Sequence, residues 1–168
     1  MAAHLLKAGH EVTVFNRTQA KAEQWVRSQG GRWASTPQQA AQGADVVITC
    51  VGRDADLREV LLGDQGAMGA LAQGAILVDH TTTSAEVARE MAGLAQARGL
   101  SFIDAPVSGG NVGAIQGGLT IMCGASPAAY ASVEPVLMAY AKAVTHVGEP
   151  GAGQLAKMVN QICVAGVL

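Results

Sequence analysis

Residues 45–51 read Asp-Val-Val-Ile-Thr-Cys-Val, an almost continuous apolar run in a chain of 168 residues. The length of this run suits a β-strand. A strand without alternating polar positions is typical of a parallel sheet that is covered on both faces. Similar short runs occur on either side of it. The other expected strands cover residues 12–15, 75–79, 100–104, 119–123 and 143–147.

Helical segments separate these runs. Ser84 begins one expected helix, and Ser126 with Pro127 has the pattern of a helix cap followed by a first-turn proline. The expected helices cover residues 1–9, 18–29, a short stretch from 37, 54–62, 84–98, a segment from 126, and 152–168. Strands that alternate with helices predict an α/β fold, a Rossmann-like doubly wound sheet with parallel strands.

The composition excludes several classes of protein. The net charge is −2, and no long run of one sign indicates a nucleic-acid surface. No apolar run reaches the roughly 18 residues of a membrane span. Cys50, Cys123 and Cys163 are an odd number without paired spacing, so we expect neither a disulfide framework nor a metal site. A cytoplasmic protein is the simplest expectation.

The turn after the first expected strand indicates the cofactor. Asn16, Arg17 and Thr18 follow residues 12–15, and none of them is acidic. In doubly wound folds an acid at this place binds the ribose hydroxyls of NAD, whereas an arginine suits the 2′-phosphate of NADP. We therefore predict NADP, with NAD possible. The competing interpretation is an ordinary surface arginine at a strand end.

Two longer motifs are more specific. The first is Asp-Ala-Pro-Val-Ser-Gly-Gly at residues 104–110, followed by Gly113-Ala114 and residues 117–119 (Gly-Gly-Leu). The second combines residues 151–153 (Gly-Ala-Gly) with residues 157–161 (Lys-Met-Val-Asn-Gln). Together they resemble the β-hydroxyacid dehydrogenase family, which includes 3-hydroxyisobutyrate dehydrogenase, tartronate semialdehyde reductase and glyoxylate/succinic semialdehyde reductases. The resemblance covers essentially the whole chain.

The resemblance implies a division into two domains. Residues 1–148 would form the NADP-binding Rossmann-like domain, without its first strand and its G-x-G-x-x-G loop. Residues 149–168 would be the first helix of an all-helical second domain, and the chain ends inside that helix without a stop signal. The full-length parent is expected to be a homo-oligomer. A non-catalytic or inactive fragment of such an enzyme remains the alternative.

The first motif predicts a substrate-binding loop at Ser108, Gly109 and Gly110. A serine hydroxyl and closely spaced backbone N–H groups can bind a carboxylate, because glycine lets the backbone approach the ligand. The competing interpretation of two adjacent glycines is a plain turn. The expected substrate is a small 3-hydroxy acid or its semialdehyde.

The second motif implies that Lys157 is the catalytic residue. An ammonium group beside the reacting oxygen can stabilise its charge and exchange a proton with it. Asn160 and Gln161 lie three and four residues further on and would share its helical face. Both amides are expected to contact substrate, although the family usually has asparagine at or beside the Gln161 position.

The resemblance also implies cofactor contacts at Val51, Gly52 and Thr82, where two expected strands end. The family usually has a Leu-Pro pair near the first two positions, and Thr82 could instead cap a helix. His80 is a candidate base, although a polar loop histidine is the commoner state. A decarboxylase similar to 6-phosphogluconate dehydrogenase is a lesser alternative for this protein, because residues 104–118 contain no lysine or arginine for a sugar phosphate.

Overall fold

The computed structural model describes residues 1–167, with side chains through residue 166. The elements are α1 (Ala2–Lys7), β1 (Thr13–Val14), α2 (Gln19–Gln29), β2 (Arg32–Trp33), α3 (Pro37–Ala41), β3 (Val46–Thr49), α4 (Asp54–Leu62), the 3₁₀ helix η1 (Ala67–Ala70), β4 (Ile76–Asp79), α5 (Ala85–Gln96), β5 (Ser101–Asp104), β6 (Val107–Ser108), α6 (Gly110–Gln116), β7 (Leu119–Gly124), α7 (Pro127–Leu137), β8 (Ala141–Gly148) and α8 (Ala152–Val167).

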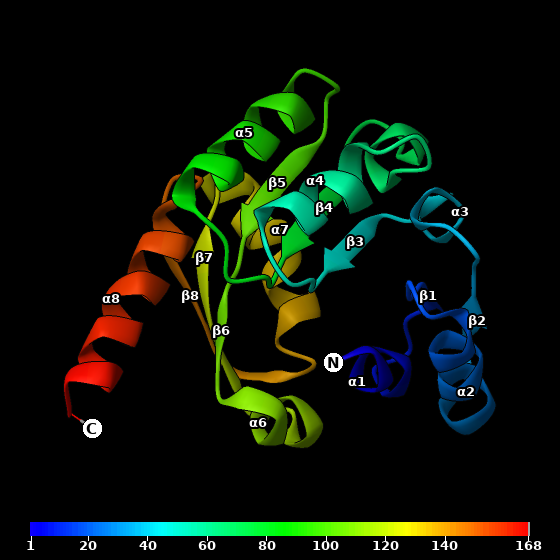
Figure 1. Ribbon diagram of the computed structural model, residues 1–168, viewed down its shortest axis with the longest axis horizontal. Coiled ribbons are helices and arrows are strands. Elements are labelled where there is room, and N and C mark those ends of the chain that lie inside the picture. Colours follow the sequence, from blue (N-terminus) through cyan, green and yellow to red (C-terminus); the bar gives the residue numbers. More distant parts are fainter. Residues whose placement is uncertain (168) are drawn as a thin grey trace.

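The strands form two sheets (Figure 1). The strands β1 and β2 pair in parallel, and a six-stranded sheet has the order β3-β4-β5-β7-β6 with β8 on the other edge of β7. The parallel arrangement expected from the sequence is correct for β3, β4 and β5. It is wrong for β7, which runs antiparallel to β5 and β6. The short connection through α6 reverses the chain, whereas the longer crossover through α7 restores a parallel pair with β8.

Two hydrophobic clusters cover the two faces of the central strands. Along β4, Ile76 and Val78 belong to the cluster that includes α7, whereas Leu77 belongs to the cluster built with α4 and α5. Along β5, Ile103 belongs to the cluster that includes α7, and Phe102 belongs to the cluster built with α4 and α5. Successive side chains of a strand point to opposite faces, so an all-apolar strand supplies both clusters. This arrangement explains why the central strands contain few polar residues, and it confirms the α/β sandwich expected from the sequence.

Short or glycine-rich elements differ from the sequence expectation. The segment between the strands expected at 100–104 and 119–123, for which the sequence shows no regular element, contains β6 and α6. The glycines of α6 conceal its helical pattern. The elements β2 and η1 are too short to show a periodicity. Ser84 and Ser126 cap their helices, each accepting a backbone N–H three residues on. Thr18 occupies the cap position of α2 but its side chain makes no capping bond.

Two further findings concern the described residues. None of their helices is long and apolar enough to cross a membrane. Within the same residues, no group of three or more His, Cys, Asp or Glu side chains is arranged to hold a metal ion.

Candidate functional site

The carboxyl ends of β3 and β4 are joined by a buried hydrogen-bond network. Asp79 Oδ1 accepts hydrogen bonds from the hydroxyls of Thr49 (2.7 Å) and Thr81 (2.6 Å). The Thr81 hydroxyl in turn accepts a bond from the backbone N–H of Val51 at 2.9 Å. The structure therefore brings together the predicted cofactor positions Val51 and Gly52 with the loop that contains Thr82. The Thr82 side chain is exposed, so it is available to a ligand.

Asp79 is fully buried, and its second oxygen, Oδ2, has no hydrogen-bond partner among the described residues. Burial raises the pKa of this carboxyl to about 6, although the bonds from Thr81 and Thr49 favour the charged form. A bare buried oxygen costs less free energy in the neutral acid than in the carboxylate. Asp79 therefore joins the two strand ends as a carboxyl group whose pKa lies well above that of an exposed aspartate.

A second buried carboxyl connects the sheet to α8. Asp104 ends β5, and its oxygens accept the backbone N–H groups of Gly151 (2.7 Å) and Gln154 (2.8 Å). The Gln154 side chain then reaches the loop after β4. Its amide nitrogen donates to Thr81 O at 2.7 Å, and its amide oxygen accepts the N–H of Thr83 at 3.0 Å. The start of α8 is thereby tied to the ends of both β4 and β5.

Lys157 lies one turn further along α8 and is only 8% exposed. The four salt bridges within the described residues do not include it. Asn160 is half-buried and Gln161 is exposed, and their amides bond to each other at 3.2 Å. The predicted helical face is therefore present, but the three side chains differ in exposure. Lys157 is therefore the most buried of the three side chains.

The predicted substrate loop has a backbone that needs glycine. Gly109 and Gly110 have φ angles of 119° and 59°, in the region that other residues rarely adopt. Ser108 is half-buried and lies opposite Thr120 of β7, while both glycines are exposed. Since α8 also packs on β7, Ser108 and Lys157 lie on two elements that flank the same strand. The segment ends β6 and starts α6, a geometry that a substrate-binding loop and a structural turn share.

The predicted adenosine-side residues lie in the smaller sheet unit. Asn16, Arg17 and Thr18 follow β1 and are exposed, and Asn16 Oδ1 accepts the N–H of Thr18 at 2.9 Å. This bond shapes the turn, and the Arg17 side chain extends from it into solvent. No hydrogen bond in the described part of the chain connects this turn to the other predicted site residues.

His80 is neither an exposed loop histidine nor a free base. It is 2% exposed, and its ring nitrogens lie 2.6 Å from Ala105 O and 2.7 Å from the Tyr140 hydroxyl. The carbonyl can only accept, so Nδ1 carries the proton and Nε2 accepts the Tyr140 O–H. Burial lowers the pKa of His80 to about 4. The ring is a neutral structural group, and the hypothesis that it is a candidate base is wrong for this geometry.

No role is predicted from the sequence for Asp79, Asp104 or Gln154, although all three are buried at the site. A signal was present for the two acids, because each directly follows apolar residues at the end of a strand. A charged residue in such a place needs a partner. The partners here are hydroxyls and backbone N–H groups, which leave no recognisable spacing in the sequence.

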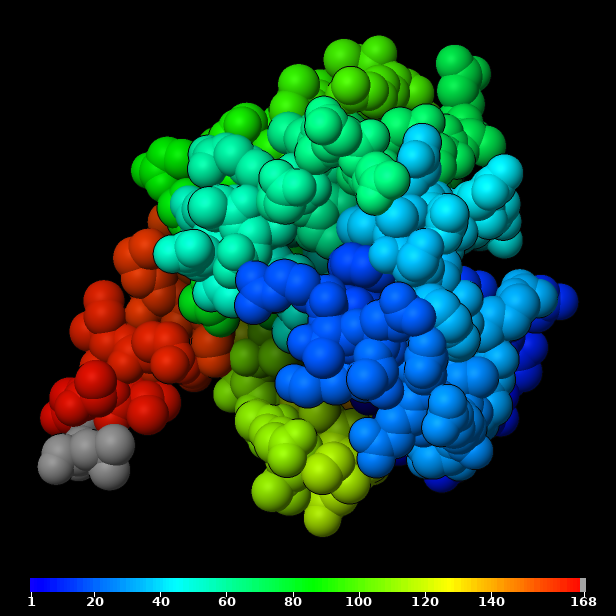
Figure 2. Space-filling view, turned by 45° about the vertical axis from the view of Figure 1, so that its right-hand side comes forward, coloured from blue at the N-terminus to red at the C-terminus, as the bar shows by residue number. Residues whose placement is uncertain are grey.

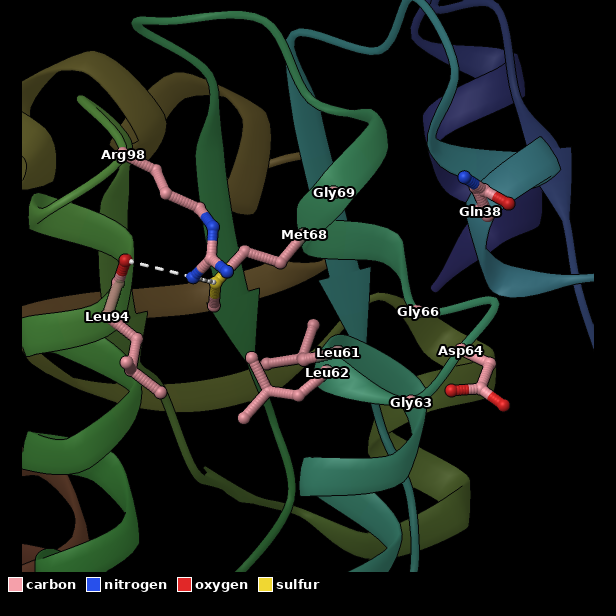
Figure 3. A pocket seen from close by; sticks show the side chains of 10 residues that line it. All are labelled: Gln38, Leu61, Leu62, Gly63, Asp64, Gly66, Met68, Gly69, Leu94 and Arg98. Atoms are coloured by element: carbon pink, nitrogen blue, oxygen red, sulfur yellow. Dashed lines mark hydrogen bonds between the residues drawn. The ribbon is translucent and has the colours of Figure 1, made fainter.

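A pocket of about 340 Å³ lies elsewhere (Figure 3). It is formed by the carboxyl ends of α4 and α5 together with η1. Helices that return between parallel strands end at the amino edge of the sheet, so this pocket lies opposite the strand ends described above. The Arg98 side chain crosses it toward Met68. None of the predicted site residues lines this pocket.

Comparison with known proteins identifies the family. Residues 1–148 match the model of the NAD binding domain of 6-phosphogluconate dehydrogenase. The chain belongs to this family. The match covers the strand ends and the turn after β1, and it ends before α8.

The similarity to curated relatives and to solved structures also includes α8. The chain is 56% identical over 168 residues to an uncharacterized oxidoreductase of Shewanella frigidimarina, covering 100% of this chain and 58% of that protein. It is 40% identical over 168 residues to 3-hydroxyisobutyrate dehydrogenase of Pseudomonas aeruginosa, covering 100% and 56%. The chain thus spans little more than half the length of these relatives.

Two solved structures share the fold. Mycobacterium tuberculosis 3-hydroxyisobutyrate dehydrogenase with L-serine superposes with a TM-score of 0.91 at 32% identity, over 98% of this chain and 55% of that one. Psf3 in complex with NADP+ and 2-OPP superposes with a TM-score of 0.90 at 31% identity, over 96% and 57%. Both confirm the Rossmann-like fold class expected from the sequence.

Proposed function

We propose that the protein is an oxidoreductase that interconverts a small 3-hydroxy acid with its semialdehyde, in the manner of 3-hydroxyisobutyrate dehydrogenase. The observation that carries the proposal is the placement of Lys157 on a helix tied to the ends of β4 and β5. Ligands of such folds bind at the carboxyl ends of the strands. The named relatives support the same class of reaction.

The cofactor is NADP, with NAD as the weaker ligand. The exposed groups suit it: Arg17 and Thr18 for the 2′-phosphate, and the Thr82 hydroxyl with Gly52 toward the nicotinamide. Half-buried Val51 lies beside Gly52 and would contact the cofactor with groups other than its N–H, which is bonded to Thr81. No acid occupies the turn after β1 to select the free ribose hydroxyl. The cofactor supplies or accepts the hydride. The NADP+ complex of Psf3 supports this preference.

The remaining roles belong to residues of this chain. Ser108 and the N–H groups of Gly109 and Gly110 bind the substrate carboxylate. Lys157 donates a proton to the carbonyl oxygen as hydride reaches the carbon, and it accepts that proton in the oxidative direction. The amides of Asn160 and Gln161 contact substrate from the same helix.

Two further features of the proposal concern the whole protein. Residues 1–148 form the nucleotide-binding domain, and residues 149–168 start a helical domain that completes the site and a homo-oligomer. Exposed apolar side chains on α8 support this division; they are Leu155, Met158, Val159 and Ile162. A cytoplasmic location agrees with three free cysteines.

The experiment that tests the proposed function is Lys157→Ala in the protein at its natural length. The kcat for 3-hydroxyisobutyrate should fall by roughly 10²–10⁴, as for loss of a positioned general acid. The Kd for NADP, measured by titration calorimetry, should stay unchanged because Lys157 serves the reacting oxygen. The matched control is Lys142→Ala, an exposed lysine on β8. A normal kcat in the Lys157 variant would remove this mechanism.

The matching family model is that of 6-phosphogluconate dehydrogenase, so 6-phosphogluconate should be tested as a second substrate in the same assay. The segment 104–118 offers no cation to its phosphate, so we expect no turnover. Turnover of 6-phosphogluconate above that of 3-hydroxyisobutyrate would replace the proposed substrate class. Absence of turnover with both, in a protein that binds NADP, would favour the non-catalytic alternative.

A further inference from the structure

We propose that Asp104 is the residue that positions Lys157, by holding the first turn of α8 against the carboxyl end of β5. The inference rests on the proposed function, because it concerns the group assigned there to proton transfer. Asp104 is fully buried, and its oxygens accept the backbone N–H groups of Gly151 and Gln154 at 2.7 and 2.8 Å. These amides are among those that a helix start leaves without an intrahelical acceptor.

The close packing around Asp104 makes this attachment rigid. A side chain on Gly153 would meet the backbone oxygens of Asp104 and Met122 at 2.5 Å each. Gly124, which pairs with Asp104 across the sheet, is likewise too close to the Asp104 carboxyl to accept a Cβ atom. The helix therefore approaches β5 and β7 as closely as backbone permits. Gly151, with φ of 94°, lets the chain turn into the helix at this distance.

Gln154 provides a second, side-chain attachment. It is 1% exposed and bonds to Thr81 and Thr83 in the loop after β4. One turn of α8 is thus fixed to two neighbouring strand ends, through Asp104 and through Gln154. Both attachments lie within six residues of Lys157 in the sequence, on its N-terminal side.

The position of Lys157 follows from this first turn. Lys157 is three residues after Gln154 and four after Gly153, so the three side-chain positions share one face of α8. Residues 161–166 are all exposed, and Figure 2 shows the end of α8 projecting from the rest of the molecule. Within the described residues, the fixed end of the helix is the end that carries Lys157. Asp104 acts through the helix and is a positioning residue, not a catalytic one.

The first test is Asp104→Asn in the protein at its natural length. The variant side chain keeps the shape of aspartate, but an amide NH₂ group replaces one carboxylate oxygen. This donor would face the backbone N–H of Gly151 or Gln154, which is also a donor. The start of α8 should move, and kcat should fall by about 10², the loss expected for a displacement of about 1 Å at a reacting group. The Kd for NADP should stay unchanged. Asp45→Asn, an exposed carboxyl at the start of β3, is the matched control and should keep the wild-type kcat.

A double-mutant cycle separates positioning from a general loss of structure. If Asp104 acts through Lys157, Asp104→Asn should cost about 10²-fold in the wild-type background and little in the Lys157→Ala background. Equal factors in both backgrounds would overturn the inference and leave the proposed function standing. A Lys157→Ala variant with normal kcat would instead overturn the proposed function itself.

A second variant covers the case in which Asp104→Asn does not fold. Gln154→Met keeps the length of the side chain and removes both bonds to the loop after β4. It should lower kcat by about 10-fold, again only when Lys157 is present. The Asp104→Asn variant could misfold while the Gln154→Met variant folds and keeps the wild-type kcat. That result would count against the inference that the first turn of α8 positions Lys157.

Discussion

At the scale of single residues, the site contains ionisable groups that burial shifts in opposite directions. The pKa values of Asp79 and Asp104 rise to about 6, while that of His80 falls to about 4. Between pH 4 and 6 the folded state therefore holds more protons on the two acids than the unfolded chain, and fewer on the histidine. The acids make stability fall as pH rises through this range, and His80 makes it increase.

The His80 contribution can be isolated with His80→Gln, which retains a donor and an acceptor but cannot titrate. Lowering the pH from 6.5 to 4 requires the buried neutral ring to remain uncharged while the unfolded ring gains a proton. Wild type should therefore lose roughly 3 kcal/mol more than the variant over this range. Urea unfolding at a series of pH values measures the difference. Parallel pH profiles for the two proteins would contradict the buried, neutral assignment.

These residues also show where sequence reasoning stopped. Lys157 and Ser108 can be predicted because their motifs have recognisable spacing. Ser108 pairs with Thr120 of β7, and Lys157 lies on α8, a helix that packs on β7. Asp104 stood inside a quoted motif without a role, since its partners are backbone N–H groups that any residue supplies. His80 was misjudged because its partners, Ala105 and Tyr140, become neighbours only when the sheet forms.

At the scale of elements, α8 depends on its close approach to the sheet. Gly153→Ala adds a methyl group where backbone oxygens of Asp104 and Met122 leave no room. Alanine normally stabilises a helix relative to glycine by about 1 kcal/mol, but overpacking here should outweigh this and destabilise the protein by about 1–3 kcal/mol. Chemical denaturation measures the change in free energy of unfolding.

Gly93→Ala is the matched control for this substitution. Gly93 lies inside α5, and a Cβ atom there would meet nothing within 4 Å. The control should therefore stabilise the protein by about 0.5–1 kcal/mol. If both variants gain stability alike, the contact between α8 and the sheet is looser than the structure indicates.

The elements that the sequence predicted well are those with long apolar patterns. The strands β3, β4, β5 and β7 and the helices α2, α4 and α5 lie within one or two residues of expectation. Three of the seven residues of the missed α6 are glycine or alanine, and Val112 and Ile115 are exposed, so no buried apolar face marks it. The chain reverses through α6, and this reversal makes β7 antiparallel to β5. The direction of β7 could therefore not be predicted without first predicting α6.

At the scale of the whole molecule, the proposed cofactor site crosses from the small sheet to the large one. Arg17 follows β1 in one, while Val51 and Thr82 follow strands of the other. Arg17→Asp should therefore change only the adenosine side: kcat/KM with NADP should fall at least 10-fold relative to NAD, because the charge partner is lost and a ribose acceptor is gained. Steady-state kinetics with both cofactors measure this ratio.

The kcat at saturating NAD should stay near the wild-type value, since Lys157 lies on α8, which packs on the larger sheet, away from Arg17. Arg27→Asp, an exposed arginine on α2, serves as the control for added negative charge. An equal change of the cofactor ratio in both variants would mean that net charge, and not a contact from Arg17, sets the preference.

The attachment of α8 to Asp104 has a consequence for evolutionary divergence. The bonded groups of Gly151 and Gln154 are main-chain amides, which remain when side chains change. Exposed positions such as Leu155 and Met158 can therefore drift without loosening the attachment. The constrained positions here are Asp104, Gln154 and the glycines that permit the approach. One helix can thus acquire different outer faces, for different neighbours or substrates, while its inner face presents the same amine at the same place.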